Sequence, residues 1–215
     1  MIIIEDVYEG NKWLQRKTVD GKYRWTVSGV IWNNIKERTT AGSVTQTKEP
    51  TYIGATNLFP DYQYFVKWHR EQIGYNCGYD LDADLFKVEK KVYSPSTCVL
   101  LPSSLNRFLQ TNNSKIRKFD ELPTGISYWG KSRKIIKVRV GWYGQEFYFE
   151  SGPIPISEIE LAKSLYLEKK NQQLQDWIVT LSGGIPIDPR VIDKLKEMEF
   201  YYEEGTYSRW GFRSI

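Results

Sequence analysis

Residues 82–106 constrain the fold more than any other stretch, because they contain two short apolar segments, a turn and the start of a helix. Asp82 and Asp84 lie at the end of the first segment, and the second segment runs from Cys98 to Leu101. The proline and two serines that follow are typical of the first turn of a helix. Oxygen ligands on the first strand and on the helix of such a strand–strand–helix unit can hold one magnesium ion. A single hydrated divalent ion is a common device for phosphodiester cleavage.

These residues resemble the HNH endonucleases of bacteriophages. The matching segments are Leu81-Asp82-Ala83-Asp84, Tyr93-Ser94-Pro95-Ser96-Thr97-Cys98, Asn106 and, upstream, residues 65–75. In HNH nicking enzymes an Asp at the end of the first strand and an Asn on the helix hold the metal. The resemblance therefore implies a ββα-metal fold that binds one Mg²⁺ (or Mn²⁺) ion through Asp84 and Asn106. Asp82 is the alternative first ligand, and these three residues are the catalytic candidates.

Two positions depart from the HNH pattern. Leu85 stands where the family places its His general base, and Ala83 stands where a Lys is usual. The only histidine, His69, shares a predicted helix face with Phe65, where we expect it to pack in the core. Two functions stay open. One is a metal-dependent endonuclease of homing or nicking type acting on double-stranded DNA. The other is a catalytically impaired HNH-fold protein that serves as a DNA-binding, or host-protein-binding and inhibitory, module.

A basic segment follows the first unit. Residues 115–148 include eight basic and three acidic side chains, so they carry +5 in a chain whose formal net charge is +4. This is the electrostatic footprint expected of nucleic-acid contact, with a solvated face as the alternative. Residues 133–140 alternate between apolar and largely basic side chains, which predicts a strand with one apolar face. A returning strand at 146–150 and a helix at 157–174 are expected next.

The segment 122–170 resembles the DNA-binding domain of plant ethylene-response factors, which is a three-stranded antiparallel sheet plus a helix. The resemblance rests on Leu122-Pro123-Thr124-Gly125-Ile126-Ser127-Tyr128 and on the alternating strand. In that family the sheet lies in the major groove and its side chains contact phosphates and bases. The matching positions, which the resemblance implies as DNA contacts, are Arg133, Lys137, Arg139, Lys131, Trp129 and Trp142. For the two tryptophans, packing between sheet and helix is the alternative.

The predicted fold class is therefore α+β, with an HNH-like ββα-metal domain at 1–112 and a sheet-plus-helix DNA-binding domain at 113–180. A C-terminal segment at 181–215 contains a helix at 186–198 and an aromatic tail. Further helices are expected at 23–38 and 60–73, separated by a loop. Two cysteines make no disulfide framework or zinc motif. Without a signal peptide or a long apolar run, we expect a cytoplasmic protein, in the host cell if it is a phage protein, with no membrane partner. Its oligomeric state stays open.

Overall fold

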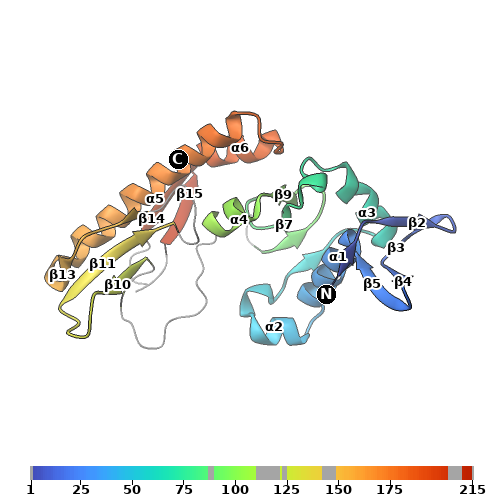
Figure 1. The fold of residues 1–215 in the computed structure, drawn as a ribbon, viewed down its shortest axis with the longest axis horizontal. Coiled ribbons are helices and arrows are strands. Elements are labelled where there is room, and N and C mark those ends of the chain that lie inside the picture. Colours follow the sequence, from blue (N-terminus) through green and yellow to red (C-terminus); the bar gives the residue numbers. More distant parts are fainter. Residues whose placement is uncertain are drawn as a thin grey trace. The chain divides into compact units, whose positions relative to one another are not determined.

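The computed structural model describes residues 2–86, 90–109, 122, 125–141, 149–202 and 210–214. The chain divides into two compact units, one formed by 1–103 with 186–188 and the other by 104–185 with 189–215. Both mix helices with small sheets, which confirms the α+β class (Figure 1). Among the described residues, no helix has the length and apolar character needed to cross a membrane. The domain boundaries expected at 112 and 180 stay predictions.

The first unit contains small sheets packed with short helices. Its sheets are β1 (Ile3–Ile4), β5 (Lys22–Thr26) and β4 (Arg16–Val19); β2 (Val7–Glu9) with β3 (Lys12–Leu14); β6 (Thr56–Asn57) with β8 (Val92–Tyr93); and β7 (Asp80–Asp82) with β9 (Val99–Leu101). Its helices are α1 (Val27–Thr39), α2 (Val44–Lys48) and α3 (Tyr62–Glu71), with 3-10 turns at Pro50–Tyr52 and Tyr75–Cys77. Strands β7 and β9 pair antiparallel, with Leu81 opposite Leu100.

Helix α1 begins four residues later than the expected start at residue 23, because β5 occupies that stretch. Thr26 ends the strand and caps the helix, since its hydroxyl accepts a hydrogen bond from the N–H of Gly29 at 3.1 Å. A Cβ at Gly29 would lie 2.2 Å from the carbonyl oxygen of Gln15. The glycine that weakens the helix pattern in the sequence is therefore required by this close approach. The stretch between the two predicted helices is not only loop, because it includes α2.

The second unit is a sheet covered by a long helix. Its elements are α4 (Ser103–Leu109), β10 (Ile126–Tyr128), β11 (Ile135–Val140), β12 (Phe149–Glu150), β13 (Ile154–Pro155), a 3-10 turn (Ile156–Glu158), α5 (Ile159–Ser182), α6 (Pro189–Lys196), β14 (Met198–Tyr202) and β15 (Trp210–Ser214). Strand β11 pairs antiparallel with β10, β12 and β13. Helix α5 runs along one face of this sheet (Figure 1). It extends eight residues beyond the predicted end at 174.

The alternation in β11 fixes which side of the sheet is buried. Ile136, Val138 and Val140 are at most 4% exposed and pack toward α5, which confirms the predicted apolar face. Gly125 precedes β10 with φ +82°, and a Cβ there would lie 2.0 Å from the ring of Tyr166. The glycine thus allows the chain to enter the sheet directly against the helix.

The C-terminal segment also folds onto α5. Helix α6 is shorter than the expected 186–198. The aromatic tail forms an antiparallel hairpin of β14 and β15, in which Phe200 lies opposite Phe212. The side chain of Asn171 in α5 accepts the N–H of Phe200 at 2.7 Å and donates to its carbonyl oxygen at 3.1 Å. These two bonds fix β14 against the helix.

Candidate functional site

The first candidate site lies around Asp82 and Asp84, just after β7. Asp82 Oδ1 accepts the backbone N–H groups of Asp84 at 2.9 Å and of Leu85 at 2.8 Å. Burial raises the pKa of Asp82, and the N–H of Leu85 opposes this rise. Strand β7 ends at Asp82, so Asp84 lies in the turn that follows the strand. Asp82 acts as the cap of this turn.

Asp84 has a cation partner. Its Oδ2 lies 2.6 Å from the ammonium nitrogen of Lys91, whose side chain is 12% exposed, whereas that of Asp84 is 50% exposed. Leu85, at the position of the HNH general base, is 4% exposed and belongs to the core. An imidazole in the place of this side chain would therefore lie in the core, away from a water molecule bound to a metal ion.

Asn106 lies on α4, which belongs mainly to the second unit, whereas Asp84 belongs to the first. Their approach to each other therefore stays a prediction. The described residues contain no group of three or more His, Cys, Asp or Glu side chains able to hold a metal ion. Within the first unit, Asp82 accepts a hydrogen bond from a backbone N–H of the turn, and Asp84 pairs with the ammonium group of Lys91. The site expected for one Mg²⁺ (or Mn²⁺) ion therefore stays a prediction.

His69 is part of a buried polar network, which confirms that it packs in the core. It is 1% exposed and stacks on Phe65, with 5.5 Å between ring centroids. The hydroxyl of Ser28 donates to Asp6, so the Nδ1–H of His69 donates to that hydroxyl at 2.7 Å. Tyr75 donates to the same carboxylate at 2.9 Å. Burial lowers the pKa of His69 to about 4, against the opposing effect of Asp6. The imidazole is thus a neutral structural group.

The second candidate site is the β10–β11 hairpin loop. Lys131, Arg133 and Lys134 are exposed and form no ion pair with any other described residue. Trp129 is 43% exposed, and the ammonium of Lys137 lies 4.7 Å from its ring centroid. Trp129 therefore lies outside the core, contrary to the packing alternative. The loop presents three cations beside an accessible indole ring.

The basic side chains on the strand itself are partly neutralised. Glu150 in β12 lies 3.2 Å from Lys137 Nζ and 2.6 Å from Arg139 Nε, on the face opposite α5. The side chains of these two cations are 17% and 33% exposed. One carboxylate thus fixes both cations and leaves a net charge of +1 among the three groups. Trp142, the remaining predicted DNA contact, lies outside the described residues.

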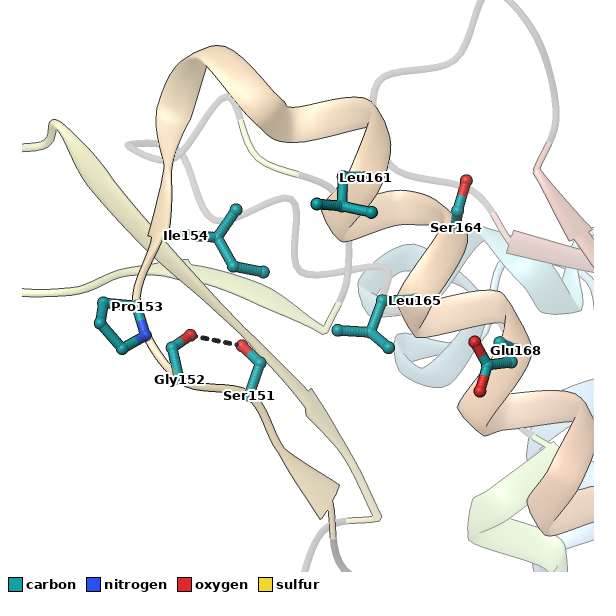
Figure 2. A pocket seen from close by; sticks show the side chains of 8 residues that line it. All are labelled: Ser151, Gly152, Pro153, Ile154, Leu161, Ser164, Leu165 and Glu168. Atoms are coloured by element: carbon teal, nitrogen blue, oxygen red, sulfur yellow. Dashed lines mark hydrogen bonds between the residues drawn. The ribbon is translucent and has the colours of Figure 1, made fainter.

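A hollow of about 370 Å³ lies between the β12–β13 connection and the first turns of α5 (Figure 2). Leu161, Leu165 and Ile154 form much of its lining. Ser151 donates its hydroxyl to the carbonyl oxygen of Gly152 at 2.8 Å and is thereby engaged. Glu168 pairs with Lys169, outside the lining, at 2.7 Å. The hollow does not present the convergent free polar groups of a catalytic pocket.

Sequence reasoning missed Lys91 and Arg38, which lie near Asp84 in the folded unit. Neither belongs to a periodic pattern or motif, and only tertiary structure brings them together. The one sequence signal for Lys91 is its place two residues before the Tyr-Ser-Pro segment. Comparisons of the chain with protein-family models, with curated proteins and with solved structures find no match.

Proposed function

We propose that the protein binds double-stranded DNA through the β10–β11 hairpin and the face of the sheet opposite α5. The observation that carries this proposal is the exposed set of Lys131, Arg133 and Lys134, which pair with no described carboxylate, beside Trp129. Phosphate contacts by Lys and Arg supply most of the affinity in DNA binding, and an exposed aromatic ring adds contacts to sugar or base.

The geometry of the hairpin supports this function. Arg133 has φ 54°, a left-handed conformation that is uncommon for a residue with a side chain. Its guanidinium group lies 5.5 Å from the ring centroid of Tyr128. The opposite face of the sheet is buried by α5, so packing against this helix supports the strands behind the loop. The exposed loop is therefore the part of the sheet that is open to a phosphate backbone.

The test is a titration of a labelled duplex at several salt concentrations. Replacing Lys131, Arg133 and Lys134 by Gln should weaken binding and reduce the slope of log K against log salt by about 0.9 for each lost phosphate contact. A matched control replaces three cations of the same unit that pair with carboxylates, namely Lys163, Lys169 and Lys196. Equal losses in the two triple variants would refute the assignment to the hairpin, and no duplex binding at all would favour a host protein as the partner.

Endonuclease activity is the second candidate. The order β7, β9, α4 along the chain and the half-exposed Asp84 carboxylate favour it. With Leu85 buried at the base position, we expect weak or absent nicking, because a His base contributes ~10²–10⁴-fold. A plasmid-nicking assay with magnesium or manganese compares wild type with Asp84→Ala. Rapid cleavage that this substitution abolishes would establish a nuclease and reject the impaired form.

A further inference from the structure

Arg38, Tyr52, Lys91 and Asp84 form a half-buried cluster in the first unit. The Arg38 guanidinium carbon lies 4.9 Å from the Tyr52 ring centroid, and the Lys91 ammonium lies 4.6 Å from the same centroid. The Asp84 carboxylate is 2.6 Å from Lys91 and acts electrostatically on Arg38 as well. Two cations therefore share one aromatic ring and one carboxylate.

The guanidinium group of Arg38 has donors to spare. It offers five N–H groups, and in the described structure it makes one hydrogen bond, to the Tyr93 hydroxyl at 3.4 Å. No described carboxylate forms an ion pair with it, and Asp84 pairs with Lys91. Tyr93 is 1% exposed and belongs to the core, so it anchors Arg38 on one side. The remaining donors suit an anion with several oxygen atoms, which a guanidinium group binds in a bidentate manner.

The charges of the cluster also favour an anion over a metal ion. Arg38 and Lys91 contribute two positive charges and Asp84 one negative charge. A divalent cation at Asp84 would compete with the Lys91 ammonium at Oδ2 and would be repelled by Lys91 and Arg38. An anion instead adds the second negative charge that this cluster lacks.

We propose that Arg38 and Lys91 bind one phosphate group of a nucleic acid, with Tyr52 in contact with both cations and Asp84 as the counter-ion that pairs with Lys91 in the free protein. This site goes beyond the function proposed for the hairpin, because it lies in the other unit and shares no residue with it. Failure of either proposal leaves the other intact.

The first experiment titrates the full-length protein with inorganic phosphate and follows backbone amide shifts by NMR. Shifts are expected at Tyr52, Lys91 and Tyr93. Arg38→Gln should abolish them, whereas Lys36→Gln, which removes an exposed charge from the same helix, should not. Arg38→Lys keeps the positive charge but loses the planar guanidinium group that can bind two oxygen atoms at once. This variant should therefore retain part of the phosphate affinity, and circular dichroism checks that it is folded. Phosphate shifts that are absent, or equally weakened by Lys36→Gln, would overturn the proposal.

Asp84→Asn distinguishes an anion site from a metal site. Removing the competing carboxylate should strengthen phosphate binding by about fivefold, the effect of one unit charge near 4 Å in water. Unchanged or weaker phosphate binding in this variant would contradict the role given to Asp84.

A last arm identifies the source of the phosphate. Affinity for a DNA duplex should fall in Arg38→Gln and in Lys91→Gln but not in Lys90→Gln, which removes the neighbouring exposed charge. If Arg38→Gln and Lys91→Gln lose affinity for inorganic phosphate but bind the duplex as tightly as wild type, the ligand is a free anion and the nucleic-acid assignment is wrong.

Discussion

The buried imidazole of His69 predicts a loss of stability in mild acid. Its pKa is about 4 in the folded protein, because burial disfavours the charged ring, against an ordinary value of about 6.5 in the unfolded chain. Because the pKa of His69 is lower in the folded protein than in the unfolded chain, the neutral imidazole contributes its full stability above pH 6.5. This contribution falls as the pH drops from there toward 4, since only the unfolded chain takes up the proton.

The magnitude follows from the two pKa values. At pH 5 the unfolded imidazole is almost fully protonated and the folded one almost fully neutral, so His69 alone should cost about 2 kcal/mol between pH 7 and pH 5. Denaturant unfolding at both pH values measures this loss in wild type and in His69→Asn, whose amide can still bond to Ser28. The variant has no imidazole, so its stability should fall by about 2 kcal/mol less over this interval. Parallel losses in the two proteins would refute the reasoning.

Two further predictions concern packing. Gly125→Ala should lower the unfolding free energy by about 2–4 kcal/mol, because it adds both backbone strain at a positive φ and a clash with Tyr166. Gly130→Ala is the control, because Gly130 has φ +81° with open space around it, so this substitution should add only the backbone strain. Equal losses of stability in the two variants, measured by thermal denaturation, would contradict the role of Tyr166. Burial raises the pKa of the Cys98 thiol to about 12 while Cys77 is exposed, so iodoacetamide followed by mass spectrometry should label Cys77 first, and simultaneous labelling in the folded protein would argue against the buried thiol.

Periodic patterns could be read from the sequence because they express burial directly. The alternation around Ile136 and Val138 predicts a strand with one buried face, and the structure has both. The lone His69 on an apolar helix face predicts a core residue, and it is one. In each case the local pattern and the tertiary contacts act in the same direction.

The start of α1 could not be predicted in this way. Trp25 falls at helical spacing with the residues that follow it, yet it lies in β5 because that segment pairs with β4 and β1. Long-range strand pairing outweighs local periodicity here. Similarly, the surroundings of Asp84 depend on Lys91 and Arg38, which approach it only when the first unit folds. Sequence spacing predicts which side chains could bind a ligand, but it does not predict which of them pair with another residue of the folded protein.

The two hydrogen bonds between Asn171 and Phe200 also bear on self-association. A strand with free backbone groups along one edge can add a strand from another molecule and begin aggregation. Strand β14 has β15 on one side, and the amide of Asn171 engages both backbone groups of Phe200. The side chain of Asn171 thus forms the two hydrogen bonds that a neighbouring strand could otherwise form with Phe200. The protein protects this edge of its last hairpin with an amide from its own helix, without a charge or a proline on the strand at that point.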